Sequence, residues 1–344
     1  MSNQAVRVFR AQKRERTMRK SAAGALFALV AGGAYLILLG QGAVSMSPGR
    51  VVEVLSGGGT SREIMAVWDL RIPVALATLI VGAALGMAGA WTQSMSRNPL
   101  ASPDILGVTS GAAVAVVLGS ISYRPSFVDD IPIFWWRAVL ALVGAVAVVV
   151  VLSLLGGIGT SNRIVLVGFA LTMMLQAGVS YLLLRAELLR AAEAQTWLAG
   201  STGFIRMDAI LPLLIGLAPF VALGLWCGRD LPLLAHDDAS AAMLGVNITM
   251  QRRLLLVAAT GVSAVVVAAV GPIGFVALIA PHFGRLVART PTPPPLVAAA
   301  AGAAILAACA VIAGLIPSTA PVGAVSAVVG GIVLVVLVWR RSGQ

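Results

Sequence analysis

The stretch LPLLAHDDASAAMLGVNITMQRRLLLVAATGVSAVVVAAVGPIGFVALIAPH, residues 231–282, decides the fold of this 344-residue chain. Its polar opening carries two adjacent acids, Asp237 and Asp238, and leads through Arg252 and Arg253 into an apolar run long enough to cross a bilayer. Crossing a membrane does not require such an acidic segment. We therefore expect it to be a surface that meets another protein at one face of a membrane domain.

The composition of the whole chain predicts an all-α polytopic membrane protein. Hydrophobic residues make up 59% of it and charged residues only 11%, which is more apolar surface than a soluble domain of this size can hide. Backbone groups in lipid must bond to one another, so the spans are helices or a closed barrel. The unbroken apolar runs at 140–155 and 298–315 lack the alternation of a barrel.

Hydropathy predicts about ten transmembrane helices in one domain, residues 22–339, between a basic tail at 1–21 and a short tail at 340–344. The expected spans are 22–44, 72–94, 104–121, 137–157, 163–185, 209–227, 252–271, 273–288, 296–315 and 322–339. The eighth is short. Outer loops are expected at 45–71, with a flexible point at Gly57–Gly58–Gly59, at 122–136, and at 186–208, where a short surface helix fits.

The distribution of cations predicts that both termini are cytoplasmic. With the N-terminus inside, 16 of the 24 Lys and Arg residues lie on the inner side and eight on the outer side. The bias depends on the seven cations of the first 20 residues, because without them the count is nine against eight. Attraction to anionic lipid explains this tail, and nucleic acid is not an expected partner because the charges are not regularly interleaved with aromatic residues.

Catalytic and metal-binding patterns are not found in the sequence. Cys227 and Cys309 are far apart and belong to no CxxC or Cys/His cluster, so they are interpreted as small packing residues and no metal site is predicted. Walker A, HExxH and GxSxG patterns do not occur either. The chain is therefore not expected to be an enzyme, and any hydrolysis that powers it must occur on another chain.

Four segments resemble the FecCD-type permease subunits of bacterial ABC importers for ferric siderophores, haem and cobalamin. They are LRIPVALATLIVGAALGMAGAWTQSMSRNPLASPDILGVTSGA at 70–112, LAHDDASAAMLGVN at 234–247, VGPIGFVALIAPHFGRLV at 270–287 and PVGAVSAVVGGIVLVVL at 321–337. They occur in the order and spacing of that family, and weaker similarity links them across nearly the whole chain.

The resemblance implies a ten-helix permease of the bacterial cytoplasmic (inner) membrane, paired with a second permease around a central path. It also implies two ATP-binding subunits, which would hold ATP and Mg, and a substrate-binding protein on the outer side; this chain would bind no cofactor itself. The part that contains WDLRIP and NPLASPD is more similar to permeases for ferric siderophores. Cobalamin or haem remains the alternative cargo.

The segment at about 231–253 is interpreted as the loop that couples the permease to its ATPase. Asp237 and Asp238 precede a helix-compatible run, 239–244, and acids near a helix start favour its positive end. Gly245 with Asn247 is expected to end that helix. The coupling residues are predicted to be Asp237, Asp238, Ala239, Ser240, Leu244 and Gly245. An ordinary solvated loop is the alternative.

The resemblance also suggests an inner gate and a path. Leu100 and Ser161 are candidates for the inner constriction, and Thr172, Met173 and Gln176 for the lining of the path, although core packing explains those three equally well. Structural positions complete the motifs: Asn98 and Pro99 in the 97–104 turn, Gly271, Pro272 and Gly274 where a span breaks, and Pro281 with His282 near the inner end of the next span.

Arg62 and Arg71 are the predicted contacts to the substrate-binding protein, Arg71 by its match to the family and Arg62 by charge. Val74 stands where many relatives have a second Arg, and Cys309 lies about where relatives have an Asp. Because this subunit offers few docking charges, a distinct sister permease, and hence a heterodimer, is expected.

Two other classes of function compete with this reading. A proton- or sodium-driven secondary transporter would place ionisable residues inside its spans as a relay, and this chain has almost none there. An intramembrane enzyme would need a paired nucleophile and base or a metal cluster, which the sequence does not display.

Overall fold

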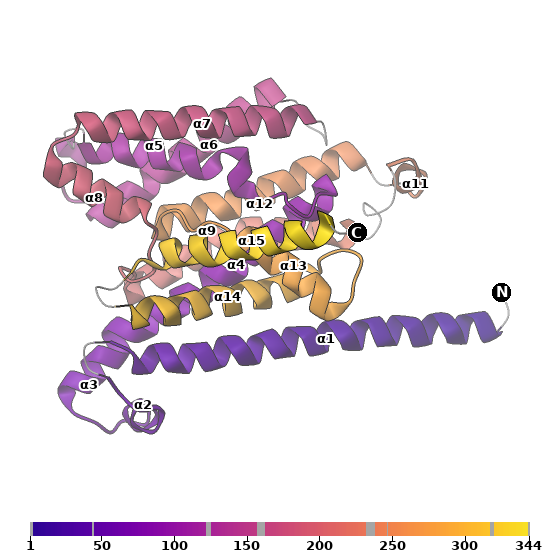
Figure 1. Cartoon of the computed structure of the whole chain (residues 1–344), viewed down its shortest axis with the longest axis horizontal. Coiled ribbons are helices and arrows are strands. Elements are labelled where there is room, and N and C mark those ends of the chain that lie inside the picture. Colours follow the sequence, from indigo (N-terminus) through magenta and orange to yellow (C-terminus); the bar gives the residue numbers. More distant parts are fainter. Residues whose placement is uncertain are drawn as a thin grey trace.

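The computed structural model describes residues 3–42, 45–121, 125–156, 162–231, 238–245, 247–316 and 320–342, and these ranges form helices and no strand. Ten apolar helices lie side by side along the long axis of the molecule (Figure 1). They are α1 (Asn3–Gly40), α4 (Ile72–Ser96), α5 (Val108–Ile121), α6 (Ile133–Gly156), α7 (Asn162–Arg185), α9 (Met207–Cys227), α12 (Ile248–Val270), α13 (Val276–Ala288), α14 (Pro295–Leu315) and α15 (Val322–Ser342). Each corresponds to one expected span, so the all-α polytopic fold is confirmed.

Two of these helices are shorter than a full bilayer crossing. α5 has 14 residues and α13 has 13, whereas seven of the described helices are long and apolar enough to span a membrane. The 13 residues of α13 extend only about 20 Å at 1.5 Å per residue. The expectation of a short eighth span is confirmed.

The first helix is longer than its expected span. α1 runs for 38 residues and includes the basic segment as far back as Asn3, so the tail described from the sequence continues the helix. Both chain ends lie at the same end of the molecule (Figure 1), as an even number of crossings requires. We call this end the termini face and the opposite end the far face.

α4 is the central helix, and glycines set its packing distances. It contacts α1, α9, α12, α13 and α14, and a Cβ on Gly82 would meet Gly302 of α14, while one on Gly86 would meet Ala298. Small residues allow this close approach of helix backbones in a membrane. The GxxxG pair of α4 therefore packs within the subunit.

The far face carries four short segments that the sequence had suggested as loops. They are α2 (Pro48–Leu55), α3 (Ser61–Met65), the π-helical turn η1 (Ala66–Arg71) and α8 (Leu188–Leu198). The short helix expected in 186–208 is confirmed as α8. The segment 45–71 connects two spans, as expected for an outer loop, but it contains α2, α3 and η1, which form a lobe beside the end of α1 (Figure 1).

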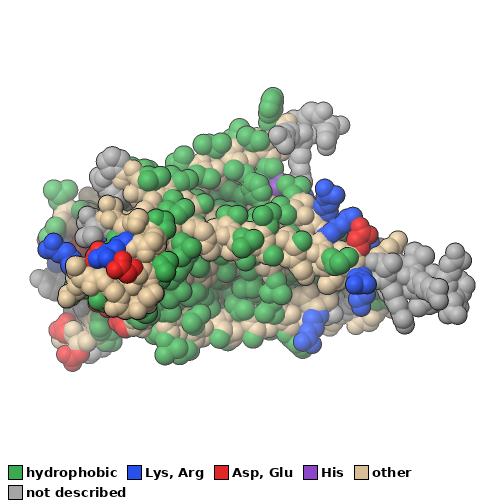
Figure 2. Space-filling model, turned by 90° about the horizontal axis from the view of Figure 1, so that it is seen from below, with side chains coloured by type: hydrophobic (Ala, Val, Ile, Leu, Met, Phe, Trp, Pro, Cys, Tyr) green, Lys and Arg blue, Asp and Glu red, His purple; other side chains and the backbone are tan. Residues whose placement is uncertain are grey.

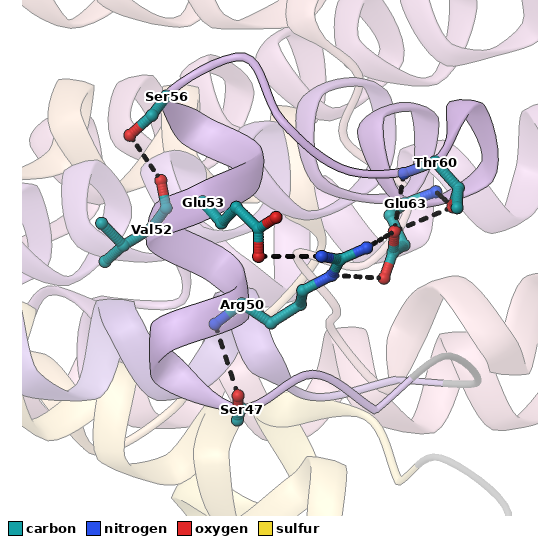
Figure 3. Close-up of polar contacts among 7 residues, drawn as sticks. All are labelled: Ser47, Arg50, Val52, Glu53, Ser56, Thr60 and Glu63. Atoms are coloured by element: carbon teal, nitrogen blue, oxygen red, sulfur yellow. Dashed lines mark hydrogen bonds and ion pairs between the residues drawn. The ribbon is translucent and has the colours of Figure 1, made fainter.

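A charged cluster holds this lobe together. The Arg50 guanidinium donates to Glu63 through Nε at 3.0 Å and Nη2 at 2.8 Å, and to Glu53 through Nη1 at 2.8 Å (Figure 3). The hydrogen bond to Glu63 and then that to Glu53 raise the pKa of Arg50. Glu63 also completes a capping box with Thr60 at the start of α3. Gly58 N donates to Glu53 O at 2.9 Å, so the glycine segment is a defined turn.

The surface divides into an apolar belt and two charged ends. Hydrophobic side chains cover the middle of the face in Figure 2, and charged side chains gather at its two ends. Trp68 on the far face is 46% exposed, which fits the aromatic belt at a membrane–water boundary.

Candidate functional site

The termini face presents a small helix that stands apart from the bundle. α11 (Asp238–Met243) projects beyond the end of α12 (Figure 1) and packs only lightly on that helix. Met243 is 88% and Leu244 66% exposed. Two large apolar side chains held in the open on a polar loop are typical of a surface that a partner covers.

The local sequence explains how α11 is delimited. Gly245 has φ +85°, a left-handed conformation that glycine adopts without cost, and its N–H donates to Ala242 O at 2.9 Å. Asn247 belongs to the next helix, because its Oδ1 accepts from Met250 N at 3.0 Å and caps α12. The expected helix at 239–244 is confirmed to within one residue at each end, and Gly245 alone ends it.

The structure describes only some of the coupling residues that the sequence predicts. Ala239 and Ser240 lie in α11 with Asp238, but only the backbone of these three is described. Asp237 lies outside the described residues, as does most of the stretch that precedes it. The coupling role of the loop stays a prediction.

The 97–104 turn lies on the termini face between α4 and α5. α4 ends at Arg97, whose φ of +51° is left-handed, and Asn98 Oδ1 accepts from Leu100 N at 2.9 Å. Pro99 belongs to this turn, and Leu100 is 40% exposed. The second gate candidate, Ser161, lies outside the described residues, so the proposed constriction stays a prediction.

The candidates for the path on α7 differ in exposure: Thr172 is half-buried, whereas Met173 and Gln176 are exposed. Thr172 points inward: its Oγ1 donates to Gly168 O at 2.8 Å and lies 3.3 Å from where a Cβ on Gly107 would be. Met173 is 48% exposed and Gln176 is also exposed. Core packing therefore accounts for Thr172, whereas Met173 and Gln176 face away from the rest of the subunit.

The break after α12 lies on the far face and its backbone is held by neighbours. Gly271 has φ +74°, and a Cβ there would meet Trp197 O. Ser201 N donates to Val270 O at 2.8 Å, and Ser326 Oγ to Gly274 O at 3.2 Å. The segment that follows α8 and the start of α15 thus satisfy two carbonyls at this break, those of Val270 and Gly274.

Pro281 and His282 lie within α13. Pro281 is buried against α4, where a Cβ on Gly89 would meet both Ala277 O and the Pro281 ring. Gln93 Nε2 donates to Leu278 O at 2.8 Å on the same face. His282 is half-buried and its ring meets Phe283 edge-on. Among the described residues, no three His, Cys, Asp or Glu side chains are grouped so that they could hold a metal ion.

The two docking arginines differ in their surroundings. Arg62 is exposed on α3. Arg71 is half-buried, and its Nη1 donates to Leu39 O at 2.7 Å in the last turn of α1. Sequence reasoning missed this structural contact of Arg71, because Leu39 is 32 residues away and no local pattern brings the two together.

The fold and its apolar helices define a multi-pass α-helical membrane protein. Residues 28–340 match the FecCD transport family, and the chain belongs to that family. It is 34% identical to the ferric enterobactin transport system permease protein FepG of Escherichia coli, over 88% of this chain and 91% of FepG. It is 31% identical to the permease protein FepD of the same transport system, over 93% of this chain and 95% of FepD.

A solved structure has the same fold. It is described as an inward-facing conformation of a putative metal-chelate type ABC transporter, and it aligns with a TM-score of 0.74 over 93% of this chain and 99% of the solved chain, at 24% identity. The protein is therefore a transport permease, a family role that is not catalytic, and it belongs to the cytoplasmic membrane.

Proposed function

We propose that this chain is the permease subunit of an ATP-driven importer that moves a ferric siderophore from the outer side of the membrane into the cytoplasm. The observation that carries the proposal is the match over most of the chain to two permeases described as parts of a ferric enterobactin transport system. Membership of the FecCD family and the shared fold support the same role.

Two ATP-binding subunits dock below the permease pair at the termini face. α11 supports this site, because its exposed Met243 and Leu244 offer an apolar knob that a cleft on an ATPase can hold. Rigid-body motion of the ATPase can then pass through α11 into α12. Only three residues separate the end of α11 from Asn247, which caps α12.

The second permease covers the exposed face of α7. Only 6% of the apolar window of α7 is buried within this subunit, and its exposed side includes Gln176, whose amide is costly to leave in lipid. A neighbouring subunit or a water-filled path would satisfy that amide. Met173 and Gln176 would then line the path, and Thr172 would support it from behind.

The second permease is a distinct sister chain. FepG and FepD are both described as permease proteins of one transport system in one organism, and this chain resembles each of them over about nine-tenths of its length. A substrate-binding protein docks on the far face, where Arg62 is an exposed cation and Arg71 lies nearby at the end of η1.

Uptake of radioactive iron tests the function. A strain that lacks this gene is given ⁵⁵Fe-loaded catecholate and hydroxamate siderophores, with and without a plasmid that carries the wild-type chain. We expect uptake of one siderophore class to be lost and restored. Unchanged uptake of every ferric siderophore would refute the cargo.

The energy source is tested separately in proteoliposomes that hold the purified complex. We expect transport to require ATP and Mg on the ATPase side and to survive collapse of the proton and sodium gradients. Transport that needs a gradient and no ATP would instead identify a secondary transporter.

A further inference from the structure

A groove runs along the bundle where α6 and α9 lie on either side of α12. Both helices pack on α12 and scarcely touch each other, so the small side chains of α12 form the floor between them. The groove has a volume of about 210 Å³. Its apolar lining includes Val139 and Leu142 from α6, Pro212 and Leu213 from α9, and Ala269 from α12.

Next to this groove, toward the far face, lies a wider cavity of about 470 Å³. Ala268 and Ala269 line both, so the two spaces adjoin along α12. The mouth lies at the membrane surface, because Val270 is the last residue of α12. Here the lining turns partly polar and includes the side chains of Arg137, Glu193, Thr196 and Ser201.

Arg137 and Glu193 lie at the mouth, and each can form further hydrogen bonds. Arg137 Nη2 donates to Glu193 Oε2 at 3.2 Å. Arg137 Nε is buried and has no hydrogen-bond partner among the described residues, although a guanidinium carries five donors. The Glu193 side chain is 55% exposed and its carboxylate can accept further bonds. The mouth therefore offers both a donor for a phosphate and an acceptor for an ammonium group.

We propose that this groove binds one phospholipid with a zwitterionic, amine-bearing headgroup, of the phosphatidylethanolamine type. An acyl chain lies in the apolar groove over Ala269, the phosphate accepts from Arg137, and the ammonium group donates to Glu193. The tryptophans fit this depth, since Trp135 lines the groove and Trp197 lines the mouth. The site lies in the leaflet of the far face and is independent of what the permease transports.

Bound lipid would join α8 to α6 and α12 at the far face. Glu193 belongs to α8 and Arg137 to α6, and their direct ion pair is a single 3.2 Å contact whose Glu193 side is 55% exposed, so by itself it contributes little. A headgroup that bonds to both side chains would add contacts in the same place.

Photo-cross-linking tests the site. The purified permease is placed in nanodiscs of mixed phosphatidylethanolamine and phosphatidylglycerol, in which one lipid at a time carries a diazirine on its acyl chain. Peptides of α6, α9 and α12 are compared with those of α1, which serves as an ordinary lipid-facing helix. We expect the ethanolamine lipid to label the groove several-fold more than α1, and the glycerol lipid to show no such enrichment.

Three variants separate the two parts of the site. Ala269→Phe should fill the groove and abolish the enrichment, whereas Val143→Phe, a 60% exposed position on α6 outside the groove, should leave it unchanged. Glu193→Gln should remove the preference for ethanolamine over glycerol, and Arg137→Gln should weaken labelling by both lipids. If Ala269→Phe fails to fold, Glu193→Gln and Arg137→Gln still test whether the headgroup binds at the mouth.

Several results would overturn the proposal. One is groove labelling equal to that of α1 with both lipids. Another is a wild-type protein that takes both lipids equally into the groove. Full competition by soluble phosphoethanolamine would show that the acyl chain plays no part. A disulfide between two copies engineered with Leu142→Cys would show that the groove is instead a subunit interface.

Discussion

The guanidinium of Arg71 donates a 2.7 Å hydrogen bond to the main-chain carbonyl of Leu39 and so closes the end of the first transmembrane helix. The carbonyl lies in the last turn of α1, where a cation also complements the helix dipole. Arg71 therefore has a structural function on the far face, whether or not it also meets a binding protein.

Replacing Arg71 should reduce stability. Arg71→Gln removes a charged donor from a part-buried carbonyl, and we expect a loss of roughly 1.5–3 kcal/mol in the free energy of unfolding, the range for hydrogen bonds to charged groups. Thermal unfolding monitored by size-exclusion chromatography measures it. Arg62→Gln is the matched control and should leave the unfolding temperature unchanged while lowering affinity for the binding protein. Equal stability of the two variants would contradict the structural role of Arg71.

A second test compares glycine-to-alanine substitutions, because the stability that each one loses depends on the space around the glycine. A Cβ on Gly89 would enter the position of Ala277 O, whereas Gly33 of α1 has nothing within 4 Å of the same point. Gly89→Ala should destabilise by about 1–3 kcal/mol through overpacking, and Gly33→Ala should be neutral or stabilising by up to ~1 kcal/mol, the difference in helix propensity. Thermal unfolding of both variants in the same lipid decides the matter; a neutral Gly89→Ala would show that α4 and α13 are not packed this closely.

The exposed apolar end of α11 predicts an effect on coupling without an effect on folding. Leu244→Ser should weaken capture of the ATPase by about tenfold or more, the change that a loss of ~1.4 kcal/mol produces, and should lower transport in proportion. Its unfolding temperature should stay that of the wild type, because the side chain is 66% exposed in the subunit. Leu29→Ser, at 74% exposure on α1, is the control for lost surface apolarity and should keep ATPase affinity. Normal ATPase capture by Leu244→Ser would remove α11 from the coupling surface.

The ten helices could be predicted from the sequence because bilayer thickness requires an apolar segment of known length, a property that each segment displays by itself. The lobe at 45–71 could not be predicted in this way. Its order depends on Arg50 reaching Glu63 across 13 residues, and the composition of that stretch, with three consecutive glycines, is typical of a loop.

The candidate site, too, could be predicted from the sequence only in part. The C-terminal end of α11 followed from Gly245, whose residue type indicates a left-handed conformation. The burial of Thr172 did not, because Met173 and Gln176 are close to it on α7 and only the position of Gly107 shows which of the three side chains meets the core. Arg71 was interpreted by charge alone, since its partner is a backbone carbonyl that any residue could supply.

The last prediction concerns Gly200, where two costs coincide. Gly200 has φ +66°, and a Cβ there would meet Pro272 O in the break between α12 and α13. Gly245 of the α11 loop has φ +85° and nothing within 4 Å of its Cβ position. Gly245→Ala should therefore cost only the left-handed strain, about 1–2 kcal/mol, and Gly200→Ala should cost that strain plus overpacking, roughly 2–5 kcal/mol together.

Hydrogen exchange shows where in the chain each glycine variant acts, in addition to how much stability it loses. Gly200→Ala should speed exchange at Ser201 and Gly323, whose N–H groups bond to Val270 O and Gly200 O at 2.8 and 2.9 Å, while Gly245→Ala should leave both amides protected. Exchange at Ser201 and Gly323 as slow in Gly200→Ala as in the wild type would contradict this prediction. The segment after α8 would then not hold the break between α12 and α13 in position, and α15 alone would hold it.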